Sequence, residues 1–269
     1  MIKIVVVGAA GRMGRTIVSC IEDSPGAELA GGTETPGHPA LGKDVGELAG
    51  IGPKNICVMD RLEDAVESAD AIIDFTTPEC SMETLRVGTE KFKPMVIGTT
   101  GFSAEQKQRV QELARKNRSV MAPNMSIGVN VLFKVVRDMA LALGEAYDVE
   151  IVEAHHKFKK DAPSGTAVRI SEILAETLNR DLDQVAVYGR KGVTERQPGE
   201  IGIHTLRAGD IVGEHRVLFG GMGENLEIFH RAQSRETFAR GAIRAACWLV
   251  DQPVGLYDMQ DVLGFRQIR

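Results

Sequence analysis

The chain has 269 residues, of which 43% are hydrophobic and 26% are charged, as is usual for a soluble protein of one large or two ordinary domains. Its formal net charge of −5 argues against a general nucleic-acid-binding surface, and the 5% aromatic content leaves little material for stacking on bases. No segment approaches the roughly 18 consecutive apolar residues that a membrane-spanning helix needs. We therefore expect no nucleic-acid partner and no membrane segment.

The first residues run directly into an apolar, β-branched segment, Ile2 to Val7, with no basic region or small-residue cleavage site before it. We therefore expect a cytoplasmic protein. The four cysteines are far apart in sequence, which predicts reduced thiols and no zinc, redox or other metal site. They are Cys20, Cys57, Cys80 and Cys247.

Residues 2–34 carry a strand–turn–helix–strand pattern. The run from Ile2 to Val7 predicts a strand covered on both faces, and glycines follow at positions 8, 11 and 14. A second predicted strand, Ala27 to Thr33, ends at Glu34, an acid 20 residues after Gly14. The glycines permit a tight turn and close approach of a pyrophosphate, and the acid can accept hydrogen bonds from ribose hydroxyls. A βα turn that binds nothing is the alternative, but the combined pattern favours a dinucleotide site.

Three more predicted strands alternate with helices before residue 127, which indicates a parallel, doubly wound sheet. The strands are Ala71–Phe75, Pro94–Thr100 and Ser119–Ser126, with helices expected from Glu79 and over Ser103–Lys116. Gly98-Thr99-Thr100 and Ala122-Pro123-Asn124 would lie at the C-terminal ends of strands, where such sheets bind ligands. Ordinary turn and capping chemistry explains these residues equally well.

Residues 153–166 gather two histidines, three lysines and a helix start into fourteen positions. His155 and His156 end a predicted strand that begins at Asp148, and we expect them to point to opposite sides. Histidine titrates near neutrality and can exchange protons with a bound molecule. Each lysine alone is typical of a solvated loop, whereas the whole group favours a site that binds an anion and transfers a proton.

A helix is predicted over Ala167–Leu178, with Ser164 as its cap. Gly165 lets a ligand approach the backbone, and the free N–H groups of a helix start can bind a carboxylate or phosphate. The lysines that precede this helix add positive charge. The segment therefore predicts a site for an anionic small molecule.

The second half of the chain is mostly predicted sheet, preceded by a helix from about Asn130 to Gly144. Expected strands cover Val185–Tyr188, Ile201–Leu206, Ile211–Phe219 and Glu224–Arg231, and a last helix starts at Ser234 with a partial capping box. Strands in series make an antiparallel or mixed sheet, so we predict an α/β fold: a Rossmann-like doubly wound parallel sheet plus a second α+β domain with an open mixed sheet. A substrate would lie between the two domains, and the open sheet favours oligomerisation.

Five motifs stand in one order along the chain: residues 8–14, 98–102, 122–126, 153–167 and 207–215. In this order they resemble the 4-hydroxy-tetrahydrodipicolinate reductase family (dihydrodipicolinate reductases), and the resemblance covers essentially the whole chain. It implies reduction of a cyclic imine dicarboxylate by a nicotinamide cofactor with net loss of water, on the diaminopimelate route to lysine. It also implies a homotetramer and a discontinuous dinucleotide-binding domain, 1–126 with 236–269, around a substrate-binding and oligomerisation domain, 127–235.

The resemblance also implies roles for individual residues. His155 would be the proton donor and acceptor, and Lys159 the second proton donor. Substrate carboxylate would be held by His156, Gly165 and Thr166. The cofactor would contact Gly8, Ala9, Ala10, Gly11, Arg12, Met13, Glu34, Gly98, Thr99, Thr100, Ala122, Pro123, Asn124 and Met125.

One position bears on the choice between NADH and NADPH. Family members that readily take NADPH carry an arginine directly after the ribose-binding acid, whereas Thr35 follows Glu34 here. The acid favours a free 2′-hydroxyl, and Arg12 on the glycine turn is the remaining cation for a 2′-phosphate. We therefore expect NADH to be used at least as well as NADPH.

Two other functions compete with this interpretation. A semialdehyde dehydrogenase would need a nucleophilic cysteine, and Cys80 stands at a predicted helix start rather than in the 153–166 cluster. A regulator that senses dinucleotide without turnover would have little use for His155 and His156 beside a carboxylate site.

Overall fold

The computed structural model describes residues 1–266, which form two compact units. Unit 1 consists of Met1–Ile127 together with the residues from Arg235 on, and unit 2 is Gly128–Ser234. These boundaries differ by one residue from the predicted ones. Within the described residues, no helix is long and apolar enough to cross a membrane.

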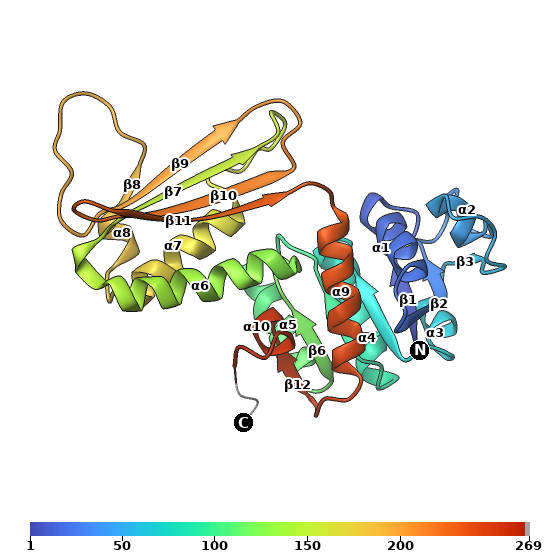
Figure 1. The fold of residues 1–269 in the computed structure, drawn as a ribbon. Coiled ribbons are helices and arrows are strands. Elements are labelled where there is room, and N and C mark those ends of the chain that lie inside the picture. The colour runs from blue at the N-terminus through green and yellow to red at the C-terminus, as the bar shows by residue number, and fades with distance from the viewer. Residues whose placement is uncertain (267–269) are drawn as a thin grey trace. The chain divides into compact units, whose positions relative to one another are not determined.

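Unit 1 contains a seven-stranded sheet in the order β12-β6-β5-β4-β1-β2-β3 (Figure 1). All its strand pairs are parallel, so the predicted doubly wound parallel sheet is confirmed. The strand order reverses between β1 and β4, the point at which open α/β sheets bind ligands. The strands are β1 (Ile2–Val7), β2 (Ala27–Thr33), β3 (Val58–Met59), β4 (Ala71–Asp74), β5 (Met95–Ile97), β6 (Arg118–Met121) and β12 (Gly255–Tyr257).

Helices cover both faces of this sheet. Successive residues of a strand point to opposite faces, so alternate residues of β1 belong to two different cores. Ile4 and Val6 pack in a core with α1 (Arg12–Glu22) and α9 (Glu236–Leu249). Val5 and Val7 pack in a second core with α4 (Pro78–Glu90) and α5 (Ala104–Ala114). Every position of β1 from Ile4 to Val7 is apolar because each face of this strand packs against a layer of helices.

Several elements of unit 1 differ from the sequence-based expectations. β3, β12, α2 (Val45–Ala49), α3 (Leu62–Ala65) and α10 (Met259–Val262) were not predicted. β5 and β6 are shorter than expected, so residues 98–100 and 122–126 lie in loops beyond the strands. α9 begins at Glu236 with Arg235 as its N-cap, and the Arg235 side chain makes no capping hydrogen bond.

Unit 2 is a five-stranded mixed sheet in the order β11-β10-β7-β9-β8. β7 pairs antiparallel with β10 and parallel with β9, which confirms the predicted mixed sheet. Its strands are β7 (Asp148–His155), β8 (Ala186–Tyr188), β9 (Ile201–Arg207), β10 (Gly213–Gly220) and β11 (Asn225–Ala232). Its helical elements are α6 (Ile127–Leu143), the short 3₁₀ turn η1 (Gly144–Ala146), α7 (Gly165–Thr177) and α8 (Leu182–Val185).

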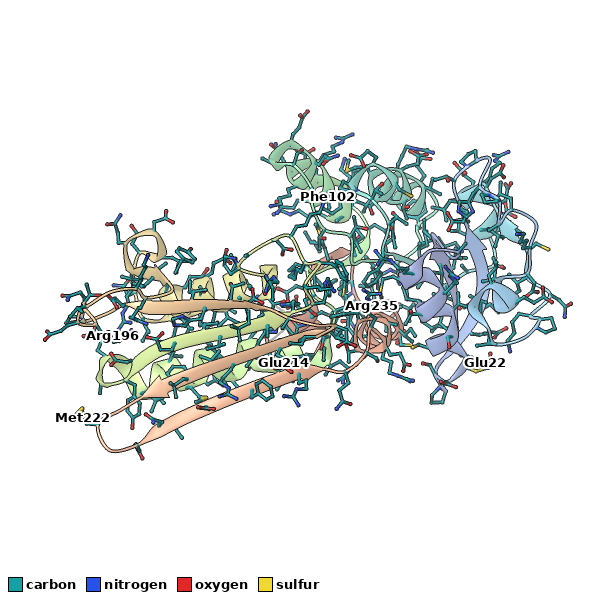
Figure 2. All side chains as sticks on the ribbon, turned by 90° about the horizontal axis from the view of Figure 1, so that it is seen from above. Glu22, Phe102, Arg196, Glu214, Met222 and Arg235 are labelled. Atoms are coloured by element: carbon teal, nitrogen blue, oxygen red, sulfur yellow. The ribbon has the colours of Figure 1, made fainter. Side chains whose placement is uncertain are left out.

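One face of the unit 2 sheet packs against α6 and α7 (Figure 1). Ile151 of β7 and Phe219 of β10 are fully buried in this core. Figure 2 shows Arg196 and Met222 at one end of the sheet and Glu214 toward the other. Glu214 pairs with Ala154, so it marks the end of the sheet at which β7 ends.

Candidate active site

The glycine turn after β1 has the shape that a dinucleotide cradle requires. Gly8 has a φ of +71°, which glycine adopts without strain. A Cβ at position 14 would lie 2.0 Å from the carbonyl oxygen of Gly8, so only glycine lets α1 start this close to the turn. Gly11 is the N-cap of α1 and supplies no side-chain hydrogen bond. The first N–H groups of this helix are therefore left without a side-chain cap, as phosphate binding at a helix start requires.

Glu34 lies beside this turn, directly after β2. Its Oε1 accepts a hydrogen bond from the backbone nitrogen of Ala10 at 2.9 Å. The carboxylate therefore lies against the turn that would hold a pyrophosphate, at the distance along the chain expected for ribose binding. Thr35, which follows it, carries no charge.

The other predicted cofactor residues lie at the same edge of the unit 1 sheet. Gly98 to Thr100 follow β5 and Ala122 to Met125 follow β6, and parallel strands end on the same side. Ala122 and Met125 are 4% and 1% exposed, so their side chains belong to the core. The ring of Phe75 packs on Gly98, where a Cβ would lie 2.3 Å from ring atoms.

Thr99 belongs to a buried hydroxyl network around Asp74, a residue to which the sequence analysis gave no role. Thr99 Oγ1 accepts hydrogen bonds from the backbone nitrogen of Thr76 at 3.0 Å and from Ser81 Oγ at 2.7 Å. Asp74 Oδ1 accepts from Thr76 Oγ1 at 2.6 Å, and burial raises the pKa of this carboxyl. The network ties the loop after β4 to the loop after β5.

In unit 2, His155 ends β7 and its ring is held by a buried glutamate. His155 Nδ1 lies 2.6 Å from Glu153 Oε2, and the His155 side chain is 12% exposed. The ring also meets His215 edge to face, with centroids 5.3 Å apart. Burial lowers the pKa of His215 to about 3, so this second histidine is neutral at pH 7.

β7 ends at His155, and His156 is the first residue after it. Its Nδ1 is buried and has no hydrogen-bond partner among the described residues. The centroids of the His156 and Phe158 rings are 6.4 Å apart.

The start of α7 follows the predicted pattern. Ser164 is the N-cap, and its hydroxyl accepts a hydrogen bond from the backbone nitrogen of Ala167 at 3.3 Å. Gly165 is the first helical residue, and a Cβ there would meet no atom within 4 Å. The Ser164 hydroxyl thus occupies one N–H group of this helix start, and the open space at Gly165 lets an anion approach the first turn.

The three lysines of the cluster have different surroundings. Lys159 is partly buried, with its side chain 22% exposed, and its Nζ lies 2.8 Å from Asp161 Oδ2. Lys157 and Lys160 are exposed, and Lys157 lies 5.1 Å above the ring of Phe158. The structure therefore separates Lys159 from its neighbours, which the sequence pattern alone left equivalent.

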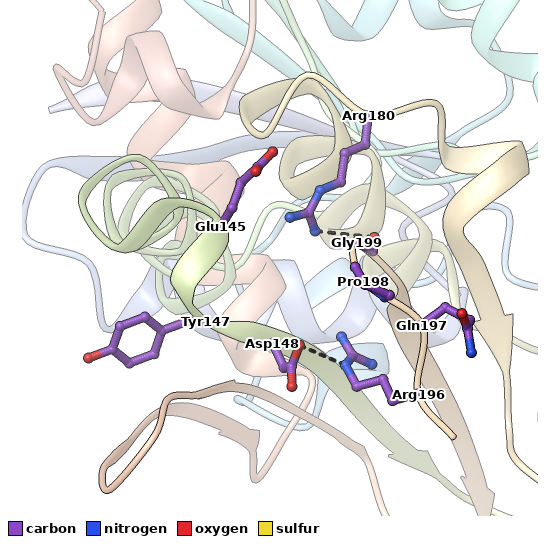
Figure 3. Close-up of a pocket in the computed structure, with 8 residues that line it drawn as sticks. All are labelled: Glu145, Tyr147, Asp148, Arg180, Arg196, Gln197, Pro198 and Gly199. Atoms are coloured by element: carbon purple, nitrogen blue, oxygen red, sulfur yellow. Dashed lines mark hydrogen bonds and ion pairs between the residues drawn. The ribbon is translucent and has the colours of Figure 1, made fainter. Parts of the chain in front are cut away.

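A pocket of about 440 Å³ opens at the other end of β7 (Figure 3). Arg196 on its wall pairs with Asp148 at 2.9 Å, and Arg180 donates to the carbonyl of Gly199 at 3.2 Å. Asp148 starts β7 and His155 ends it, so the two sites are about 23 Å apart along the strand. The pocket is therefore separate from the His155 cluster.

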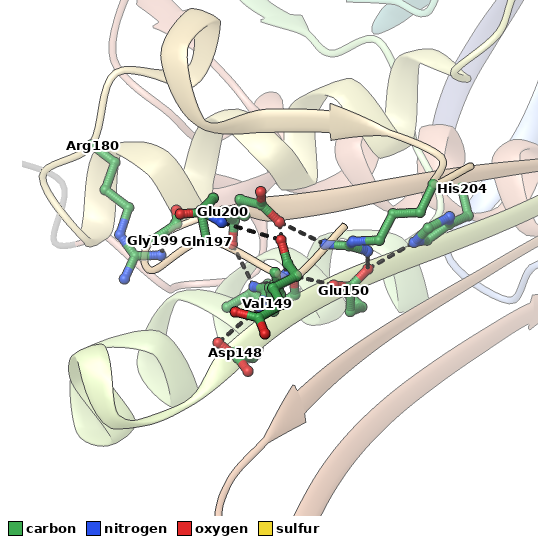
Figure 4. A network of polar contacts seen from close by, with 11 residues as sticks. Asp148, Val149, Glu150, Arg180, Gln197, Gly199, Glu200 and His204 are labelled. Carbon is green, nitrogen blue, oxygen red and sulfur yellow. Dashed lines mark hydrogen bonds and ion pairs between the residues drawn. The ribbon is translucent and has the colours of Figure 1, made fainter. Parts of the chain in front are cut away.

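Next to this pocket, Glu150 is the centre of a polar network (Figure 4). It pairs with Arg190 Nη1 at 2.9 Å, Arg196 Nη1 at 2.6 Å and His204 Nε2 at 2.7 Å. These contacts connect β7, β9 and the loop that precedes β9. The charged groups of this network are paired with one another, which indicates a structural role for them.

Both units match one known family. Residues 2–125 match the description "Dihydrodipicolinate reductase, N-terminus", and residues 128–263 match "Dihydrodipicolinate reductase, C-terminus". The chain belongs to the dihydrodipicolinate reductase family. The resemblance drawn from the five motifs is thereby confirmed, and residues 2–125, the first part of unit 1, are the nucleotide-binding Rossmann domain of this family.

Dihydrodipicolinate reductase relatives cover almost the whole chain. The 4-hydroxy-tetrahydrodipicolinate reductases of Syntrophus aciditrophicus and Geotalea daltonii are 53% and 54% identical to it over 267 residues, which is 99% of this chain and 100% of each relative. A solved structure, dipicolinate-bound dihydrodipicolinate reductase from Paenisporosarcina sp. TG-14, has a TM-score of 0.76 at 27% identity. The match covers 97% of this chain and 98% of that one.

A member of the dihydrodipicolinate reductase family needs no nucleophilic cysteine. The surroundings and positions of the cysteines are consistent with this. Burial raises the pKa of the Cys80 thiol, which makes the thiolate scarce at pH 7. Unit 2, which holds the histidine cluster, contains no cysteine. The semialdehyde dehydrogenase alternative therefore lacks its central residue.

Proposed function

We propose that the chain reduces (2S,4S)-4-hydroxy-2,3,4,5-tetrahydrodipicolinate to tetrahydrodipicolinate, consuming NADH or NADPH and one proton and releasing water. The observation that carries the proposal is full-length identity above 50% to reductases of this name. The reaction belongs to lysine biosynthesis through diaminopimelate, and we expect it in the cytoplasm.

The start of α7 is our proposed site for a substrate carboxylate. Gly165 and Thr166 form the first turn, and Gly165 leaves open space in front of the backbone. Backbone N–H groups and the positive end of the helix dipole favour an anion at this place. His156 would contribute a further hydrogen bond to the carboxylate. The dipicolinate bound to the Paenisporosarcina reductase is a dicarboxylate of the same class.

Proton transfer is assigned to His155 and Lys159. His155 is held by Glu153, and Lys159 lies in the short loop between His155 and α7. The bound nicotinamide supplies the hydride. The residues of the chain bind and orient the dicarboxylate, and they exchange protons from a partly buried position in which charge interactions are stronger than in water.

The nicotinamide cofactor is assigned to the glycine turn and the adjoining strand ends. Contacts are expected from residues 8–13, Glu34, residues 98–100 and residues 122–125. We propose that NADH serves at least as well as NADPH, because Glu34 would repel a 2′-phosphate and Thr35 offers no positive charge. Arg12 is the cation nearest in sequence that could offset this repulsion.

The function is tested by cofactor oxidation with enzymatically generated substrate. The purified chain is expected to oxidise NADH, followed by absorbance, only when 4-hydroxy-tetrahydrodipicolinate is supplied. The kcat/KM for NADH is expected to equal or exceed that for NADPH. Binding of the cofactor without any turnover would instead support a dinucleotide-sensing regulator.

The same assay can contradict the cofactor assignment alone. A kcat/KM for NADPH more than about tenfold above that for NADH would contradict the role of Glu34, even with full reductase activity. Arg12→Ala provides the matched comparison. If Arg12 contacts the 2′-phosphate, this substitution should lower kcat/KM for NADPH more than kcat/KM for NADH.

We further propose that four copies assemble through the sheet of unit 2. The sheet face opposite α6 and α7 carries exposed apolar side chains, including Leu206 (53%) and Phe229 (43%). Phe229 lies beneath the guanidinium groups of Arg216 and Arg231, 5.3 and 5.1 Å from its ring centroid. An apolar sheet face of this kind is usually covered by another chain.

Sedimentation velocity is expected to give four times the chain mass. Phe229→Glu should dissociate the assembly, because it places a charge in the centre of the proposed contact. Phe92→Glu is the control, since Phe92 is 77% exposed in unit 1. A monomeric wild-type protein, or equal dissociation by both variants, would contradict the proposal.

A further inference from the structure

Glu153 is a charged residue on the core-facing side of β7. It follows Val149 and Ile151 at two-residue spacing, and all three side chains are buried, with Glu153 0% exposed. An isolated carboxylate in this position would be strongly destabilising, so it must be paired and hydrogen-bonded.

The carboxylate of Glu153 receives five hydrogen bonds from three elements. Arg207 of β9 donates through Nη1 to Oε2 and through Nη2 to Oε1, both at 2.9 Å. The backbone nitrogen of Ser164, at the start of α7, donates at 3.0 Å, and Thr205 Oγ1 donates at 3.2 Å. The fifth contact is that of His155 Nδ1 at 2.6 Å.

This set of donors keeps Glu153 ionised. Burial alone would raise its pKa, but hydrogen bonds from His155, Arg207 and Ser164 lower the pKa to about 2. A carboxylate has no proton to donate, so His155 must carry its proton on Nδ1 when it forms this contact. Its Nε2 is therefore the atom that remains for proton exchange.

The backbone of β10 passes close to His155 Nε2 at a position without a side chain. A Cβ at position 213 would lie 3.1 Å from Nε2, and Gly213 of β10 supplies none. A larger residue there would cover the atom. Glu153 therefore contacts Nδ1 of the ring, and Gly213 places no side chain against Nε2.

We propose that Glu153 is a positioning residue of the reduction, which fixes the tautomer of His155 and stabilises its protonated ring through the contact at Nδ1. The proposal rests on the proposed function, because it assigns Glu153 to the proton transfer of that reaction. It goes beyond a structural ion pair with Arg207, since the charge of Glu153 then contributes to turnover itself.

Each element packed against His155 contributes a charged, titratable or polar group to its surroundings. β7 contributes Glu153, β9 contributes Arg207, and the following loop contributes Lys159 paired with Asp161. β10 contributes His215, which is neutral at pH 7, and His230 of β11 is close enough to His215 to influence it. The first turn of α7 contributes the uncharged Ser164. Glu153 is therefore the only carboxylate in direct contact with His155 among residues 1–266.

The first test measures the tautomer in the wild-type protein and needs no activity. Nitrogen-15 chemical shifts of labelled histidines, with the His155 signals assigned by their loss in His155→Ala, should show the proton on Nδ1 at pH 7. A neutral ring with its proton on Nε2 and none on Nδ1 would overturn the proposal. This result is independent of the reductase assay, so failure of the proposed function remains distinguishable.

The second test is Glu153→Gln, which keeps the shape and removes the charge. We expect kcat to fall by on the order of 10²-fold, with the affinity for dipicolinate changed by less than about threefold. The limb of the kcat/KM profile on which activity is lost with rising pH should move to lower pH, because the variant removes the negative charge beside His155 Nδ1. A purely structural role would change the amount of folded protein and leave the pH profile in place.

Glu150→Gln is the matched control. Glu150 lies on the same strand and pairs with two arginines and a histidine, as Figure 4 shows, but on the opposite face from Glu153. We expect it to leave the pH profile and the His155 tautomer unchanged. Equal shifts in both variants, or turnover within about twofold of wild type in Glu153→Gln, would overturn the assignment.

Discussion

His155→Ala is expected to lower kcat by about 10²-fold or more, with a smaller change in KM. The imidazole is the titratable group held by Glu153 at 2.6 Å, and its 12% exposed side chain limits competition from water. Removing it takes away proton transfer but leaves Gly165 and Thr166 at the start of α7 to bind carboxylate. Steady-state kinetics with saturating NADH and varied substrate measures the two effects separately.

His204→Ala is the control for this substitution. His204 also pairs with a glutamate of β7, through Nε2 to Glu150 at 2.7 Å, but it lies on the other face of the sheet. We expect its kcat to stay within about threefold of wild type. Near-normal turnover in His155→Ala would reject the assignment of the proton donor. A loss of equal size in His204→Ala would indicate general damage to the sheet.

The dinucleotide half of the fold was predictable because its pattern is local. Ile4 to Val7 is apolar at every position, and the structure explains this by two helical layers, with α1 and α9 on one face and α4 and α5 on the other. The glycine turn and Glu34 follow at fixed distances along the chain. Local spacing was therefore sufficient to predict where they meet.

The elements that escaped prediction are short and lie mostly at the edges of the sheet. β3 has two residues and β12 three, and both are edge strands. β12 joins the sheet through residues far away in sequence, since Leu256 pairs with Ser119. A pairing of this kind depends on tertiary contacts, and no alternation within three residues could indicate it.

The burial of Glu153 could have been predicted from the sequence. Once a strand is expected from Asp148 to His155, Val149, Ile151 and Glu153 fall on the same face. A carboxylate on the core side requires a cationic partner. Arg207 was part of a quoted motif, but its pairing with Glu153 follows only from the parallel register of β7 and β9, in which His155 pairs with Arg207.

Replacing Lys159 by alanine is the second change expected to have a large effect, again lowering kcat by about 10²-fold if its ammonium delivers a proton. The side chain is 22% exposed, and its Nζ lies 2.8 Å from Asp161 Oδ2. Its backbone nitrogen donates to the carbonyl of His156 at 3.1 Å, which holds this residue close to the two histidines. Single-turnover kinetics at saturating substrate measures the chemical step without interference from product release.

Lys157→Ala and Lys160→Ala decide whether the effect belongs to one ammonium group or to the charge of the whole segment. Both lysines are exposed, so their attraction for an anionic substrate is screened by salt and should influence KM at low ionic strength. Lys159 is partly buried and should influence kcat at every salt concentration. If Lys157→Ala reduced kcat as strongly as Lys159→Ala, or if added salt removed the difference, the segment would act through its summed charge, and Lys159 would have no separate part in proton transfer.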